Sequence, residues 1–444
     1  MEDFFACTLT EIKKNVIIYK VNFTFIKEGE HIMNKLIGNA VVGQSGGPTA
    51  AINATLSGVI RGAMELRDEG IIPKLYGMRN GIQGLLEERL IDLFEAFDDE
   101  SKLRTLEHTP AAALGSCRKK LPEAVLGDET YEKLIEIFKK NNIRYFFYIG
   151  GNDSMDTADK LGKYSELCGY EMRVIGVPKT IDNDLPVTDH TPGFGSAAKY
   201  IAATTQEIIR DCAVYDVKAV TIIEIMGRDA GWLAASSALG RHICGAEPDL
   251  VYLPEKAFDM EKFFEDVKKA LDKHPNVVIA ISEGIRDAEG NYVGSSTQSG
   301  ATDVFGHKYL GGSGKALENA IKERFGCKVR SIELNLCQRC ASHIASKTDL
   351  DESVIVGKTA VHAAVDGASR VMMSINRVSD APYKIEVGTV NVHDVANKEK
   401  IVPDEFINAE GNHLTDACID YLLPLIRGEV DIEYKNGLPV HIIL

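Results

Sequence analysis

The sequence lacks several features that mark secreted and membrane-spanning proteins. It contains no run of about 20 apolar residues, so no membrane-spanning helix is predicted. Residues 1–5 lack the basic stretch, followed by an apolar one, that begins a secretory signal. The nine cysteines are odd in number and scattered, which favours free thiols in a reducing compartment over a disulfide framework. We therefore expect a cytoplasmic protein.

Basic residues are scarcer than acidic ones. Lys and Arg number 50 against 65 Asp and Glu, which gives a net charge of −15. This balance argues against a nucleic acid or an anionic membrane surface as the main partner. Proline is limited to 14 residues and no segment has low complexity, so disorder is not expected. The 444 residues, 45% of them hydrophobic, can form two or three domains without disulfide or metal support.

Residues 1–32 differ from the rest of the chain. Their apolar residues follow no sustained period, and a new pattern begins at Met33. Residues 27–30 can be encoded by a purine-rich stretch containing GGAG, which would lie where a ribosome-binding site for Met33 belongs. Our hypothesis is that Met33 is the native start and that residues 1–32 are a translated leader. The alternative is a genuine N-terminal extension, and the intact mass of the protein from its native source distinguishes the two.

From Met33 onward, short apolar runs alternate with longer amphipathic segments. The runs are rich in Val and Ile and are followed by Gly or polar residues: 37–42, 145–149, 174–177, 219–225 and 277–281. Helical patterns separate them, for example over residues 51–69, 131–140 and 258–273. This order is typical of buried parallel strands in βαβ units. It predicts an α/β fold whose ligands bind at the carboxyl ends of the strands.

Two glycine-containing motifs follow predicted strands. Gly46 and Gly47 lie between a strand and a helix, where backbone N–H groups can approach an anion. Asn152 and Asp153 follow the Gly150-Gly151 pair, and the carboxylate can bind Mg²⁺ or repel an unwanted group. Each motif has a purely structural alternative, a tight turn in the first case and a helix cap in the second.

A third motif combines a lysine with two carboxylates directly after a buried strand. Lys179 is suited to neutralise a transferring phosphoryl group, and an aspartate, Asp182 or Asp184, can accept a proton from an attacking hydroxyl. Thr180 lies between the lysine and these two aspartates. The alternative is an acidic surface loop, but the tight grouping after a buried strand favours a functional site.

The fourth motif spans the ends of two later strands. Met226, Gly227 and Arg228 follow one strand, and an arginine beside a glycine suits phosphate binding. Glu283 follows the next strand, and its carboxylate suits sugar hydroxyls. Each of these signals is weak when taken alone.

Taken together and in this order, the four motifs resemble the phosphofructokinase family from about Met33 to the C-terminus. The resemblance implies two Rossmann-like three-layer α/β domains with mostly parallel sheets and an active site in the cleft between them. It implies a phosphoryl-donor domain of residues 33–193 with about 338–400. A sugar-phosphate domain would comprise residues 194–337 with about 401–444. The family reaction moves a phosphoryl group onto the 1-hydroxyl of fructose 6-phosphate.

Two positions indicate the phosphoryl donor. ATP-dependent members usually carry Gly-Gly-Asp-Gly and Pro-Gly-Thr-Ile-Asp, whereas diphosphate-dependent members replace the last Gly of the first motif by Asp and the Gly of the second by Lys. This chain has Asp153 and Lys179 there. A carboxylate at about 4 Å from the α-phosphate of ATP would cost about 4 kcal/mol at an effective dielectric constant near 20. The resemblance therefore implies reversible, Mg²⁺-dependent transfer from diphosphate, as in glycolysis and gluconeogenesis.

The resemblance also implies residue roles. Asp182 would be the base, with Thr180, Arg228 and Lys179 as further catalytic residues. The other roles fall on three sets of residues: Gly46, Gly47, Arg118, Asp153 and Lys179 for the donor; Thr180, Asp182, Met226, Gly227, Arg228, Glu283, Arg330 and Arg339 for the sugar phosphate; and Asn152, Asp153 and Asp184 for the metal. Arg330 would reach a neighbouring subunit, which implies a homodimer or homotetramer.

The chain departs from the ATP-dependent pattern at three places. Asn152 replaces a metal-binding aspartate, so Asp153 or bound diphosphate would carry more of the Mg²⁺. Ala219 replaces a second intersubunit arginine, and Leu336 replaces a histidine. Alternatives remain an ATP-dependent phosphofructokinase, a non-catalytic regulatory subunit of the same fold, and an enzyme that also accepts sedoheptulose 7-phosphate.

Overall fold

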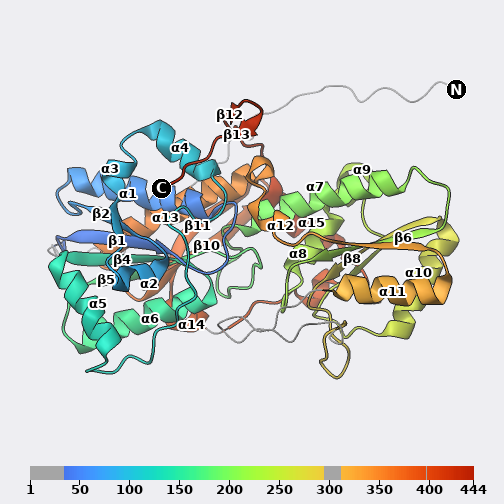
Figure 1. Cartoon of the computed structure of the whole chain (residues 1–444), viewed down its shortest axis with the longest axis horizontal. Coiled ribbons are helices and arrows are strands. Elements are labelled where there is room, and N and C mark those ends of the chain that lie inside the picture. The colour runs from blue at the N-terminus through green and yellow to red at the C-terminus, as the bar shows by residue number, and fades with distance from the viewer. Residues whose placement is uncertain (1–34, 295–311, 397) are drawn as a thin grey trace.

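The computed structural model describes residues 35–294, 312–396 and 398–444. The hypothesis on residues 1–32 lies outside this part of the chain. The described residues form two α/β halves, each built on its own sheet, that lie side by side (Figure 1). Within these ranges, no helix is both long and apolar enough to cross a membrane.

The first half contains a seven-stranded sheet in the order β11-β10-β5-β4-β1-β2-β3. Strands β1, β2, β4, β5 and β10 pair in parallel, whereas β3 and β11 add antiparallel edges. The bounds are β1 Asn39–Gln44, β2 Leu75–Met78, β3 Leu90–Asp92, β4 Ile143–Gly150, β5 Arg173–Pro178, β10 Val371–Asp380 and β11 Tyr383–Asn391.

Helices cover both faces of this sheet, as alternating side chains of β4 show. Tyr145 and Phe147 pack in the same cluster as α1 (Ile52–Asp68) and α13 (Lys347–Val365). Phe146 and Tyr148 pack on the other face with α5 (Glu129–Lys140) and α6 (Asn152–Leu167). Burial on both faces explains why the strand reads as a continuous apolar run. Smaller helices complete this half: α2 Gly81–Leu86, α3 Leu93–Ala96, α4 Glu100–His108 and α14 Val392–Val395.

The second half contains a four-stranded, all-parallel sheet in the order β7-β8-β6-β9. Its strands are β6 Ala219–Ile225, β7 Leu250–Tyr252, β8 Asn276–Ser282 and β9 Lys328–Glu333. One face packs with α7 (Phe194–Cys212) and α8 (Trp232–Ala235), and the other with α10 (Met260–Lys273) and α11 (Ser313–Phe325). The remaining α-helices of the described residues are α9 Arg241–Cys244, α12 Cys337–Cys340 and α15 Asp416–Leu422. The strands β12 Tyr434–Lys435 and β13 Leu438–Pro439 form a separate two-stranded sheet.

The predicted α/β fold with mostly parallel sheets is confirmed. Four predicted strands lie within β4, β5, β6 and β8, but the first is shifted from 37–42 to Asn39–Gln44, where pairing with β2 and β4 begins. The first sheet is built from residues 39–178 and 371–391, and the second from residues 219–333. The domain boundaries near 193, 338 and 400 stay a prediction.

Candidate active site

A cavity of about 710 Å³ is lined by residues from both halves. It brings together most of the predicted site residues: Gly46, Gly47, Arg118, Asn152, Asp153, Lys179, Thr180, Asp182, Asp184, Met226, Arg228, Glu283 and Arg339. These residues lie within or close to segments that follow β1, β4, β5, β6, β8 and β9, together with a loop before α5. Parallel strands present their carboxyl ends at one edge of a sheet, which is why segments distant in sequence meet here.

The turn after β1 holds two cationic side chains close to its backbone. Gly46 has a φ of +76°, in the left-handed region that favours glycine, and the Nζ of Lys179 donates a hydrogen bond of 2.7 Å to the oxygen of Gly47. A Cβ at Gly47 would lie 3.1 Å from a terminal nitrogen of Arg339. The glycines therefore let Lys179 and Arg339 approach the turn.

The polar side chains of the segment after β4 do not cap the helix that follows it. The N-cap of α6 is Gly151, so neither Asn152 nor Asp153 caps the helix. The amide nitrogen of Asn152 donates to the oxygen of Lys398 at 2.9 Å, while its Oδ1 is buried without a partner. Asp153 forms an ion pair of 3.1 Å with Lys120 across the cavity lining.

The loop after β5 is buried or half-buried over residues 179–186, so it is not an acidic surface loop. Lys179 is 3% exposed, and its backbone N–H donates to the oxygen of Gly150 at 3.0 Å. Thr180 pairs with the returning chain through its N–H, and its hydroxyl accepts from the N–H of Asp182 at 3.1 Å. Backbone hydrogen bonds to Gly150 and Pro192 therefore hold the start of the predicted catalytic sequence, and the Thr180 hydroxyl holds the backbone of Asp182.

Burial and neighbouring charge act on the titratable groups of this loop. Burial, together with the charge of Glu283, raises the pKa of Asp182 above its ordinary value, against the opposing effect of Lys179. Burial and the charge of Asp182 likewise raise the pKa of Asp184. Burial lowers the pKa of Lys179 to about 8, although both aspartates oppose this shift. These are the shifts expected for a proton acceptor and a cation tuned near neutral pH.

The ends of β6 and β8 are tied to each other. The hydroxyl of Ser282 donates to the oxygen of Gly227, and the N–H of Glu283 donates to the oxygen of Ile225 at 2.8 Å. Gly227 has a φ of +128°, and a Cβ there would lie 2.6 Å from the oxygen of Ala230. Gly227 does not line the cavity itself, but its conformation sets the direction of the chain into Arg228.

Two arginines of the predicted phosphate grip are separated. Arg339 lies on α12 and lines the cavity. Arg330 lies on β9, is exposed, and is not part of the lining. The resemblance implies that Arg330 reaches the active site of a neighbouring subunit. The structure of a single chain therefore does not bring Arg330 to an active site.

Sequence reasoning missed several residues that line the cavity: Glu224, Glu333, Asn335, Gln338 and Glu399. Glu224 is a polar residue inside an apolar run, which was an available signal; its carboxylate accepts from the N–H of Gly314 at 2.7 Å. Glu333 and Asn335 end or follow β9, a strand that the pattern did not reveal. No motif or sequence pattern around Glu399 indicated a functional site.

The described residues contain no group of three or more His, Cys, Asp or Glu side chains that could hold a metal ion. Asn152, Asp153 and Asp184 nevertheless line one cavity, and the buried Oδ1 of Asn152 has no partner among the described residues. Mg²⁺ is usually held by one or two protein oxygens together with substrate phosphates and water. The donor set fits such a site and not a metal site formed by protein alone.

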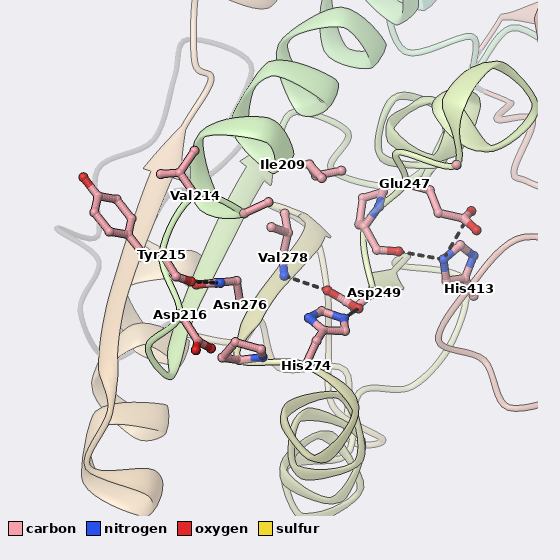
Figure 2. A pocket seen from close by; sticks show the side chains of 14 residues that line it. Ile209, Val214, Tyr215, Asp216, Glu247, Asp249, His274, Asn276, Val278 and His413 are labelled. Atoms are coloured by element: carbon pink, nitrogen blue, oxygen red, sulfur yellow. Dashed lines mark hydrogen bonds and ion pairs between the residues drawn. The ribbon is translucent and has the colours of Figure 1, made fainter. Parts of the chain in front are cut away.

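A second cavity, of about 730 Å³, lies near the amino-terminal ends of β6 and β8 (Figure 2). The Nε2 of His274 lies 2.7 Å from Asp249, and the Nε2 of His413 lies 2.9 Å from the oxygen of Pro248. No Lys or Arg occurs among the described residues that line it. Because it offers phosphate groups neither a lysine nor an arginine, the candidate active site is the cavity that holds most of the predicted site residues.

Comparisons with known proteins agree with this arrangement. The chain matches the family described as Phosphofructokinase over residues 39–364. It is 45% identical over 403 residues to "Pyrophosphate--fructose 6-phosphate 1-phosphotransferase" of Halomonas elongata, covering 90% of this chain and 94% of that protein. It is 43% identical over 413 residues to the protein of the same name from Methylococcus capsulatus, covering 91% and 96%.

A solved structure gives the same result. The crystal structure of "Pyrophosphate-dependent phosphofructokinase from Nitrosospira multiformis" matches with a TM-score of 0.82 and 40% identity, covering 91% of this chain and 96% of that chain. The likeness therefore extends through both halves. This chain belongs to the phosphofructokinase family.

Proposed function

We propose that the chain transfers a phosphoryl group reversibly from diphosphate to the 1-hydroxyl of fructose 6-phosphate, giving fructose 1,6-bisphosphate and phosphate. The observation that carries this proposal is the position of the Lys179 ammonium, 2.7 Å from the oxygen of Gly47 and in the same cavity as Asp182. Relatives that bear the name of this reaction support it. Such soluble phosphorylated substrates fit the predicted cytoplasmic location.

In the proposed mechanism, Asp182 accepts the proton of the sugar 1-hydroxyl as this oxygen attacks the transferring phosphoryl group. A raised pKa makes its carboxylate a better proton acceptor than an exposed one. Lys179 offsets the charge that spreads over the phosphoryl oxygens, while the turn at Gly46 and Gly47 and the side chain of Arg118 hold the donor. Thr180 fixes Asp182 through its hydroxyl.

The sugar phosphate is assigned to residues at the ends of β6 and β8 and on α12, where Arg339 also approaches the donor turn at Gly47. Glu283 binds sugar hydroxyls, and Met226, Arg228 and Arg339 contact the phosphorylated sugar. Arg330 of a second copy completes the phosphate grip in a homodimer or homotetramer. The tied ends of β6 and β8, with Gly227 at their bend, hold these groups in place.

Mg²⁺ would be held by Asn152, Asp153 and Asp184 together with diphosphate, and it would neutralise charge on the diphosphate oxygens. Donor choice is assigned to Asp153 and Lys179. The Lys120 partner of Asp153 offsets part of the repulsion that this carboxylate exerts on the α-phosphate of ATP.

The proposal is tested by assaying the purified chain with fructose 6-phosphate and either diphosphate or ATP. We expect turnover with diphosphate. Asp182→Asn should lower kcat by about 10²- to 10⁴-fold while the protein stays folded. Robust turnover with ATP and none with diphosphate would show that ATP is the phosphoryl donor and that the proposed donor is wrong. No turnover with either donor would favour a regulatory subunit, and faster turnover of sedoheptulose 7-phosphate would change the acceptor.

A further inference from the structure

Lys400 is a lysine that belongs to none of the four motifs. Its Nζ donates three hydrogen bonds, to the Oδ1 of Asn183 at 3.1 Å, the oxygen of Thr188 at 3.2 Å and the oxygen of Asp189 at 2.7 Å. All three acceptors lie in the loop after β5, beginning one residue beyond Asp182. Burial lowers the pKa of Lys400 to about 8, as expected for an ammonium inside the fold.

The backbone of Lys400 links the same loop to the second half. Its N–H donates to the oxygen of Asp184 at 2.7 Å, and its carbonyl oxygen accepts from the indole N–H of Trp232 at 3.0 Å. The ammonium also lies 5.4 Å from the centre of a Trp232 ring. Trp232 begins α8, four residues after Arg228. One residue therefore connects the loop of the proposed base with the element that follows the sugar-phosphate motif.

Adjacent residues extend this connection on both sides. The oxygen of Lys398 accepts from Asn152 at 2.9 Å, and the N–H of Val402 donates to Glu255 at 2.9 Å. The same oxygen of Glu255 also accepts from the N–H of Gly231 at 2.8 Å. The stretch 398–402 thus contacts both halves on its way from α14 toward α15, elements labelled on opposite halves in Figure 1.

The loop needs such support because its backbone is strained. Asn183 has a φ of +53° and Val187 a φ of +63°, and the left-handed region is unfavourable for a β-branched residue such as valine. Conformations of this kind persist only where the surroundings hold them. The three hydrogen bonds of the Lys400 ammonium span the segment that contains both positions.

We propose that Lys400 is a positioning residue that holds Asp182 at a fixed place relative to the sugar-phosphate side of the cavity. The inference rests on the proposed function, in which Asp182 accepts the proton. Misplacing a general base slows the chemical step, whereas other groups assigned to the two substrates, such as Arg118, Glu283 and Arg339, lie on other segments. The expected signature is therefore a loss in kcat with little change in KM.

The test compares Lys400→Met with Lys256→Met. The first change keeps the aliphatic length and removes all three donors. The second removes a surface ammonium that pairs with Asp404 at 2.9 Å. Asp404 lies two residues beyond the stretch 398–402. For Lys400→Met we expect kcat per folded molecule to fall about tenfold or more, with both KM values within about threefold of the unmodified chain. Lys256→Met should match the unmodified chain.

A milder variant keeps the test decisive if Lys400→Met unfolds. Trp232→Phe removes the hydrogen bond to the Lys400 oxygen and retains an aromatic ring. It should lower kcat severalfold and leave both KM values nearly unchanged. Unchanged kcat in folded variants, or a rise in KM alone, would overturn the role of Lys400. Absence of diphosphate-dependent turnover in the unmodified chain would instead overturn the proposed function.

Discussion

At Lys179, two opposing effects act on one ammonium. Burial favours the neutral amine, whereas Asp182 and Asp184 favour the charged form, and the balance lowers the pKa to about 8. The lysine is charged below this value and neutral above it. We therefore expect kcat/KM to fall as pH rises through about 8, and to fall again at acid pH as Asp182 becomes protonated.

Lys179→Arg separates these effects, because arginine keeps its charge throughout this range. The pH profile of kcat/KM, corrected for the ionisation of diphosphate, should lose its alkaline decline in this variant even if the maximum is lower. An alkaline decline at the same pH in Lys179→Arg would show that another group is responsible.

Asp153 illustrates how a single contact changes a charge argument. The sequence predicts a full negative charge facing the α-phosphate of ATP, but Lys120 lies 3.1 Å from this carboxylate, and both side chains are more than a third exposed. Solvent and the lysine reduce the repulsion well below the value for an isolated pair. Asp153→Gly should tighten ATP inhibition of the diphosphate reaction by about tenfold or less.

The matched control is Asp156→Asn, one turn further along α6, where the carboxylate pairs with Lys160 at 2.9 Å outside the cavity. Its inhibition constant for ATP should not change. A tightening equal to that of Asp153→Gly would point to a general effect of charge. If neither Asp153→Gly nor its combination with Lys179→Gly improves ATP binding, the assignment of donor choice to these residues is wrong.

At the scale of elements, the turn between β1 and α1 combines a left-handed backbone with contact to the Lys179 ammonium. Gly46 has a φ of +76°, and a Cβ there would lie 3.4 Å from the Nζ of Lys179. Gly70 has the same φ, with nothing within 4 Å of the Cβ position. Gly46→Ala and Gly70→Ala should each lower the free energy of unfolding by about 1 kcal/mol.

The two variants should differ in activity. Only Gly46→Ala should raise the KM for diphosphate, because only this turn contacts Lys179. Urea unfolding and steady-state kinetics of both variants check the prediction. Equal KM values in the two variants would remove this turn from the donor site.

At the scale of the whole molecule, a buried ion cluster joins distant parts of the first half. His190, in the loop after β5, lies 2.6 Å from Glu352 on α13 and 2.8 Å from Asp189. Burial alone would lower the pKa of His190, but the two carboxylates outweigh it and raise the pKa to about 9. The hydroxyl of Tyr383 on β11 donates to Glu352 at 2.9 Å, so the cluster also reaches the sheet edge.

A pKa raised in the folded state stabilises the protein while the histidine is charged in both states. This stabilisation is complete below about pH 6.5, the ordinary value for histidine, and is lost as pH rises through about 9. His190→Gln should therefore destabilise the chain more at pH 6 than at pH 9. Urea unfolding at both values, with the exposed His393→Gln as control, measures the difference; equal losses at the two pH values would contradict it.

Much of this molecule could be predicted from local pattern. Buried parallel strands read as short apolar runs, and polar or glycine residues at their ends mark the ligand edge. For this reason β4, β5, β6 and β8 were identified, and most of the predicted site residues line the cavity. Strands of three or four residues, such as β2 and β7, give too short a signal. The edge hairpin of β10 and β11 was also missed, because part of it is exposed and it lacks a continuous apolar run.

The sequence by itself determined the α/β class, the motif residues and, through them, the family. Only the tertiary structure decided which side chains oppose or support those residues. Two contacts depend on which segments the topology brings together: the ion pair of Asp153 with Lys120, and the hydrogen bonds of Lys400 to the loop of Asp182. Lys400 and Asn183, for example, lie 217 positions apart in the sequence. A local pattern records the periodicity of one segment, whereas such contacts are set by how both sheets and the crossing chain pack.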